Sequence, residues 1–335
     1  MKKILYIFVL MQFSFLSGGL YSQVATTGGK GLAKVLSADP VKAADIFVNW
    51  NASTFMEQTS RTTLSKYYRS DLNVTVGLAS YLEVYLNITP YQDDQTHLWG
   101  QFGNTHLGLK YLTPFSSSFF KLGLDGFFKF PTARIGNVGY ESFFSENPAW
   151  AMRGLLSLDF IKIMPSFPLK FNFNYGYIDH DIYDQYFTSK IDQMLIGAGF
   201  KFSIRSIQFF TEYSGEIFFN NPTEVEFNQN SQRVTQGIRF LGPWNNTIDV
   251  SFDYGLTQYD SLETDDIFHK EYYDWKVRIG VTHRFSVQKY FDKTAKLERM
   301  KEEEERRKLE AIKKKRQKVK EDIQKMKNSL EKKKK

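Results

Sequence analysis

The chain has 335 residues, with 31 Phe, 19 Tyr, no Cys and a formal net charge of +7. Beyond the N-terminus it contains no apolar run of 18 or more residues, which argues against a helical membrane protein. The lack of cysteine excludes disulfides, thiolate chemistry and cysteine-ligated zinc or iron–sulfur sites. The positive charge is concentrated in residues 293–335, which hold 19 Lys/Arg against 9 Asp/Glu. Residues 23–292 are therefore net acidic, and nucleic-acid binding is not expected.

Residues 1–22 have the pattern of a secretory signal peptide. Two lysines precede an apolar run over residues 4–16, and small residues follow. We expect cleavage after Ser22; a retained N-terminal anchor is the alternative, but the apolar run is short for a membrane span. Residues 23–44 are expected to form a periplasmic lead-in to the domain that follows.

Residues 45–287 contain twelve segments in which apolar and polar residues alternate. Leu72–Leu78 alternates throughout, and residues 170–177 place four aromatic residues on one side and two asparagines on the other. Alternation at period two is expected of a strand with one apolar and one polar face. The predicted segments are 45–51, 72–78, 82–90, 106–112, 119–132, 150–162, 169–178, 190–202, 207–218, 231–241, 246–259 and 273–287.

The connections between these segments alternate in length. Short ones, such as 203–206 and 242–245, contain turn residues, whereas long ones, such as 52–71 and 260–272, have more than ten residues. Short periplasmic turns alternating with long external loops are typical of outer-membrane barrels. The sequence thus predicts an all-β fold: an antiparallel, transmembrane, up-and-down β-barrel of about 12 strands. An even strand number places both termini in the periplasm.

The last segment, residues 275–285, carries a further signal. Trp275, Val277, Ile279, Val281 and Phe285 share one face, and basic residues share the other. Residues 45–287 resemble bacterial outer-membrane β-barrel proteins, the broad class that includes OmpA-like N-terminal barrels and small porins. The last segment is also similar to the C-terminal assembly signal that the barrel-insertion machinery reads. Its positions are matched by Arg278, Gly280, His283 and Phe285, with His283 where an apolar residue is usual.

Charged residues on the predicted inward face alternate in sign between neighbouring strands. Opposite charges on adjacent strands can pair, and pairs count for more in a partly desolvated lumen. One interpretation is a charged constriction that filters small solutes. The other is a neutralised interior that plugs and stiffens the barrel. The candidate lumen residues are Glu212, Glu216, Arg233, Arg239, Asp249, Asp253, Lys276, Arg278 and Arg284.

The long loops are rich in carboxylates. Asp179, His180 and Asp181 form a possible acid–base group of an outer-membrane hydrolase, although solvated loop charge is the simpler explanation. We therefore predict no catalytic residue, no metal site and no cofactor, and we do not expect an enzyme.

Residues 288–335 are predicted to form a basic α-helical periplasmic tail. Apolar residues recur at steps of three and four, interrupted by Arg316, as in a short coiled coil. Such a tail would be attracted to the cell wall or to anionic lipid. The leading functional hypothesis is a narrow passive channel or a structural protein of the Gram-negative outer membrane, in contact with its lipid. The alternatives are the hydrolase and an envelope tether or assembly factor acting through the tail.

Overall fold

The computed structural model describes residues 24–58, 64–93, 100–133, 147–180, 192–219, 226–257 and 272–287, with residues 300, 303 and 304. The chain divides into a compact unit that ends at Phe285 and a second unit that begins at Ser286. The first unit is a β-barrel, described next.

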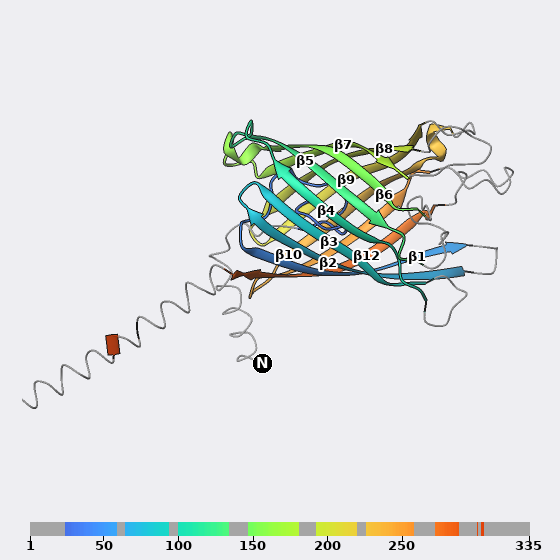
Figure 1. Ribbon diagram of the computed structural model, residues 1–335, viewed down its shortest axis with the longest axis horizontal. Helices are drawn as coiled ribbons and strands as arrows, with labels where there is room; N and C mark the ends of the chain where they lie inside the picture. The colour runs from blue at the N-terminus through green and yellow to red at the C-terminus, as the bar shows by residue number, and fades with distance from the viewer. Residues whose placement is uncertain are drawn as a thin grey trace, which may run out of the picture. The chain divides into compact units, whose positions relative to one another are not determined.

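Twelve antiparallel strands follow one another around the barrel, and β12 lies beside β1 to close it (Figure 1). The predicted up-and-down barrel is confirmed. The strands are β1 (Asp45–Gln58), β2 (Leu64–Ala79), β3 (Leu82–Gln92), β4 (Thr105–Leu112), β5 (Phe120–Phe130), β6 (Ala149–Asp159), β7 (Leu169–Asp179), β8 (Asp192–Ile204), β9 (Ile207–Phe219), β10 (Ser231–Leu241), β11 (Asn246–Gly255) and β12 (Trp275–Ser286).

Most outward-facing residues of the strands are apolar, and most lumen-facing residues are polar. On β11, Val250 and Phe252 are 40% and 44% exposed, whereas Ser251 and Asp253, which alternate with them, are buried. The same alternation places Phe240 of β10 on the exposed face. This arrangement is the reverse of a water-soluble fold, in which the apolar face is buried.

The first two strands are longer than the sequence predicted. The predicted loop 52–71 is wrong, because pairing continues as far as Gln58 and Leu64. The rings of Phe55 and Tyr67, on opposite strands, stack with centroids 4.7 Å apart. Such a cross-strand aromatic contact stabilises the extension, but its partners become visible only when the register is known. Residues 160–162, predicted as strand, form a 3-10 turn.

Residues 24–41 lie inside the barrel, and we call this segment the plug (dark blue in Figure 1). Two isolated β-bridges, Val24 to Lys30 and Gly31 to Leu36, fold it back on itself. Its apolar side chains are almost fully buried against inward-facing residues of the strands. Within the lead-in expected at 23–44, residues 24–41 precede β1 in the chain and lie in the lumen.

The signal peptide, residues 1–22, lies outside the described residues. The predicted tail, 288–335, is described only at Met300, Glu303 and Glu304, which have helical backbone, so the tail helix stays a prediction. Within the described residues, none of the helical segments has the length and hydropathy needed to span a membrane.

Candidate functional site

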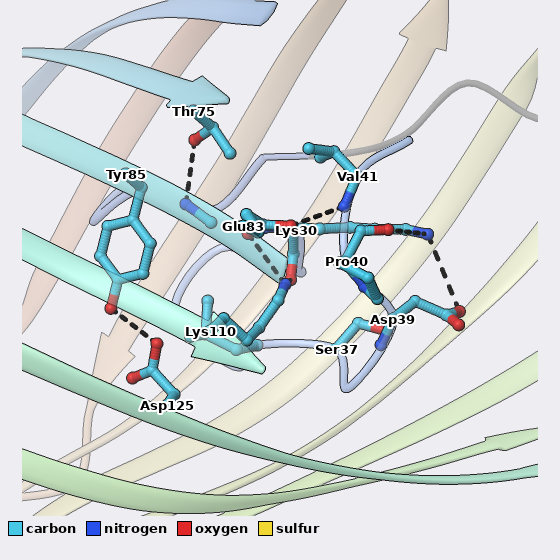
Figure 2. A network of polar contacts seen from close by, with 12 residues as sticks. Lys30, Ser37, Asp39, Pro40, Val41, Thr75, Glu83, Tyr85, Lys110 and Asp125 are labelled. Carbon is cyan, nitrogen blue, oxygen red and sulfur yellow. Dashed lines mark hydrogen bonds and ion pairs between the residues drawn. The ribbon is translucent and has the colours of Figure 1, made fainter. Parts of the chain in front are cut away.

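The plug is held in the lumen by side chains from several strands, and the first of these anchors is Glu83 on β3. One carboxylate oxygen accepts the backbone N–H of Lys30 at 2.7 Å, and the other accepts that of Val41 at 2.6 Å. Lys110, opposite Glu83 on β4, completes the anchor with an Nζ–Oε1 distance of 2.9 Å. Both side chains are completely buried, and Figure 2 shows Glu83 between the plug and Lys110. A single carboxylate thus joins the middle and the C-terminal end of the plug to the wall.

Tyr85, two residues along β3, supports the turn of the plug. A Cβ on Gly28 would lie 2.6 Å from the Tyr85 ring, and Gly28 has a φ of +92°. Only glycine meets both requirements at low cost. The Tyr85 hydroxyl donates to Asp125 at 2.8 Å, and Asp125 in turn accepts from Arg153 at 2.7 Å. The plug therefore rests on a ring that is itself fixed by a buried ion pair.

A second group of charges surrounds Asp39 near the C-terminal end of the plug. Its carboxylate pairs with Lys121 of β5 and lies 3.7 Å from Lys30 Nζ (Figure 2 shows the Lys30 contact). Burial alone would raise the pKa of the Asp39 carboxyl, but the two lysines outweigh it and hold that pKa well below its usual range. Asp39 is thus a carboxylate at any pH at which the protein functions.

Glu212 of β9 is the anchor on the opposite side of the plug. Its carboxylate accepts three consecutive backbone N–H groups, from Ala33 at 3.1 Å, Lys34 at 2.7 Å and Val35 at 3.0 Å. The side chain is 1% exposed. Hydrogen bonds to a charged acceptor are about twice as strong as neutral ones. Glu212 therefore binds the plug through backbone atoms alone, whatever side chains the plug carries there.

Two neutral anchors complete the set. Asn174 of β7 accepts the N–H of Leu36 at 2.6 Å and donates to its carbonyl at 2.9 Å. Ser157 of β6 accepts the N–H of Ala38 at 2.8 Å, and its Oγ lies 3.2 Å from that of Ser37. Apolar contacts fill the space between the anchors: Leu36 packs in one cluster with Leu155, and Leu32 in another with Phe210. The plug is as specifically packed as a protein core.

A cavity of about 160 Å³ lies over the plug, toward the end of the barrel where the longer connections emerge. Lys34 and Val35 of the plug contribute to it, together with inward residues of the strands. Six of the lining residues are basic and two are acidic: Lys34, Arg69, Lys129, Arg153, Lys276 and Arg278, against Asp71 and Glu216. The cavity is therefore a positively charged vestibule with the plug at its base.

The candidate lumen residues all lie on strands β9 to β12, and several meet in pairs. Arg239 pairs with Asp249 across β10 and β11, and Arg278 binds Asp253 with an Nη2–Oδ2 distance of 2.8 Å. Arg284 instead binds Asp45 of β1, at 2.7 Å. Glu212 binds the plug, and Arg233 donates hydrogen bonds to Ser231 and Tyr273. The ammonium group of Lys276 lies over the Tyr273 ring. Glu216 and Lys276 line the cavity. Their role as a solute filter stays a prediction.

The four residues of the predicted assembly signal lie on both faces of β12. Arg278 and Gly280 face the lumen, where a Cβ on Gly280 would lie 2.3 Å from Asn51 Oδ1. His283 and Phe285 face outward, with ring centroids 4.3 Å apart. Recognition of this segment by insertion machinery stays a prediction.

The possible hydrolase group is only partly described, because Asp181 lies outside the described residues. His180 is buried, and its Nε2 lies 2.9 Å from Gln193 Oε1. Burial, with a contribution from the Lys129 charge, lowers the pKa of His180 to about 3. A histidine with so low a pKa is a poor general base near neutral pH. Among the described residues, no group of three or more His, Asp or Glu side chains is placed to hold a metal ion.

Sequence reasoning missed the plug and most of its anchors. The candidate list included Glu212 but not Glu83, Lys110 or Asn174. Their inward position follows from strand alternation, yet they bind backbone groups of the plug up to 138 residues away in the chain. The available signal was compositional: residues 24–41 are rich in Gly, Ala, Ser and Thr, which fit a narrow lumen.

Comparisons with known proteins give distant structural similarities. No family model matches the chain, and no curated protein matches its sequence. Among solved structures, the NanC porin has a TM-score of 0.48 and 11% identity, covering 70% of this chain and 98% of that one. The KdgM porin has a TM-score of 0.45 and 9% identity, covering 71% and 99%. At these values the function must be argued from this chain's own residues.

Proposed function

We propose that the protein is an integral outer-membrane β-barrel whose lumen its own N-terminal segment closes. Support for the membrane comes from the barrel's two faces. Apolar side chains such as Leu109, Val250 and Ile279 are 40–50% exposed, while the polar side chains between them are buried. A closed barrel satisfies every strand's backbone groups without water, which a bilayer requires. With twelve strands, the chain enters β1 and leaves β12 at the same end of the barrel, and we place that end on the periplasmic side.

We further propose that the barrel is a narrow channel that conducts when the plug leaves its anchors. The observation that carries this proposal is the mode of attachment of the plug. It is bound noncovalently, because its backbone N–H groups donate hydrogen bonds to Glu83, Glu212, Asn174 and Ser157, and it is packed beside a charged vestibule. Contacts of this kind can break and re-form. When the plug leaves, the space that it occupied beneath the vestibule becomes the path for solute.

A reversible lock on the plug tests the channel. The natural chain has no cysteine, so the double variant Ser37→Cys/Ser157→Cys introduces a single pair at positions where the two Oγ atoms are 3.2 Å apart. In planar bilayers, the oxidised variant should be silent, and reduction should restore the discrete current steps of the natural protein. The single variant Ser37→Cys is the matched control and should not respond to oxidation. Equal current from the locked and reduced forms would show that the plug does not gate the barrel.

A structural barrel of the envelope is the second candidate, favoured by the buried ion pairs of the lumen. The pairs Glu83–Lys110 and Asp125–Arg153 brace adjacent strands whether or not the plug moves. If the natural, reduced and anchor-deficient proteins are all electrically silent at high protein loading, this second function replaces the channel.

A further inference from the structure

Four polar atoms without hydrogen-bond partners lie in residues that line the vestibule. They are Asn87 Oδ1, His106 Nε2, Gln193 Nε2 and Arg278 Nη1, from strands β3, β4, β8 and β12. Asn87 and Gln193 are each 1% exposed, and Arg278 is 5% exposed. A buried polar group left unsatisfied destabilises the fold.

The orientation of two of these donors is fixed by their other contacts. Arg278 already donates through Nη2 to Asp253, which leaves Nη1 as a second, separately directed donor. Gln193 Oε1 accepts a hydrogen bond from His180 Nε2, so its amide nitrogen is held on the other side. Both side chains are thus oriented before any ligand arrives, which lowers the entropic cost of binding.

The charge around the cavity favours an anion. Arg153 and Arg278 each bind an aspartate outside the lining set, Asp125 and Asp253. Even with these two carboxylates counted, the six basic lining residues outnumber the acids. Low-dielectric walls concentrate such an excess and raise the local concentration of a solute of opposite charge.

One wall of the vestibule is apolar. Phe127, Ile178 and Leu195 line it and pack against one another with Ala149 and Ala151. The cavity of about 160 Å³ has room for a compact body beside an anionic group.

We infer that the vestibule binds a small organic anion, with its charged group among the basic lining residues and its body against Phe127. This site is separate from channel gating, because every residue in it is in place while the plug is docked. We expect the anion to bind while the plug is docked, so that the vestibule holds the solute before the barrel opens.

Titration calorimetry on the full-length protein in detergent tests this inference, with glycerol 3-phosphate as the probe and glycerol as its uncharged match. Glycerol 3-phosphate should bind saturably at one site, and glycerol should not. The oxidised Ser37→Cys/Ser157→Cys variant should bind equally well. Because that variant cannot release its plug, the result is independent of whether the channel proposal holds.

Isosteric variants locate the site. Gln193→Glu keeps the oxygen that faces His180 but adds a negative charge, and should weaken binding at least tenfold. Gln208→Glu is the matched control: it makes the same change on β9, at a buried lumen position outside the cavity lining, and should leave affinity unchanged. Arg278→Lys retains a cation for Asp253 but loses the second donor, and should weaken binding several-fold. No saturable binding of glycerol 3-phosphate, or equal effects of the two glutamate variants, would overturn the inference.

Discussion

The Glu212 anchor offers the sharpest test of the plug, because its described partners are three backbone N–H groups. Replacing Glu212 with Gln keeps the shape of the side chain but removes its charge and converts one acceptor oxygen into a donor. At least one of the three bonds is lost, and the two that stay are neutral. Loss of a hydrogen bond to a charged group corresponds to about 1.5–3 kcal/mol. The fraction of molecules with a released plug should therefore rise about 10- to 150-fold.

Labelling of a buried thiol measures this fraction directly. Ala38→Cys places a cysteine at a position of the plug that has no exposed surface. A water-soluble maleimide should react with it only when the plug is released, so the reaction rate should rise in the Glu212→Gln background by the predicted factor. Glu216→Gln is the control, with the same change four residues along β9 and away from the described plug contacts. The oxidised Ser37→Cys/Ser157→Cys lock should suppress the conductance that Glu212→Gln increases.

Two results would refute this reasoning. Equal labelling in the Glu212→Gln, Glu216→Gln and natural backgrounds would mean that Glu212 does not hold the plug. Faster labelling without any change in conductance would mean that the plug is released but does not block the path of ions.

Three further predictions concern stability and ionisation. Lys110→Met leaves the Glu83 carboxylate buried without its cation. Urea unfolding in detergent should show that the free energy of unfolding falls by about 3–5 kcal/mol. A decrease below about 1 kcal/mol would contradict the buried pair. Val250 lies near the middle of the exposed face of β11. In a bilayer, Val250→Arg should lower the free energy of unfolding by about 2–4 kcal/mol, whereas Val250→Leu should leave it unchanged. Equal stability of the two variants would place that face in water. Since burial and Lys129 lower the pKa of His180 to about 3, its imidazole should stay neutral from pH 8 to pH 5 by NMR. The unfolded chain takes up that proton near pH 6.5, so this histidine should reduce stability as the pH falls below 6.5, and a titration midpoint near 6.5 in the folded protein would contradict it.

The strands could be predicted because their signal is local. Each strand shows its two faces within ten or so residues, and β10, for example, begins and ends at the predicted Ser231 and Leu241. The extension of β1 and β2 was missed because residues 52–58 lack a clear apolar alternation. There the structure is decided by pairing with a neighbour, including the Phe55–Tyr67 stack, and not by the strand's own pattern.

The site could be predicted only where the partners share a strand register. Arg239 and Asp249 stand directly opposite each other on neighbouring strands, so their pairing follows from the order of the strands. The contact between Glu212 and Val35 joins residues 177 apart, and one partner is a backbone group that every residue has. Neither periodicity nor residue type identifies such a contact, which explains why the lumen charges were expected but the plug was not.

The position of the plug in the chain also bears on how the molecule is assembled. The plug is followed at once by β1, and β1 meets β12 at the seam that completes the cylinder. If that seam forms last, the open, curved sheet can wrap around a segment that is already seated on its inner wall. No chain end then has to be threaded through a finished pore. Folding order, and not only folded-state energy, would thus explain how eighteen residues come to be enclosed so tightly.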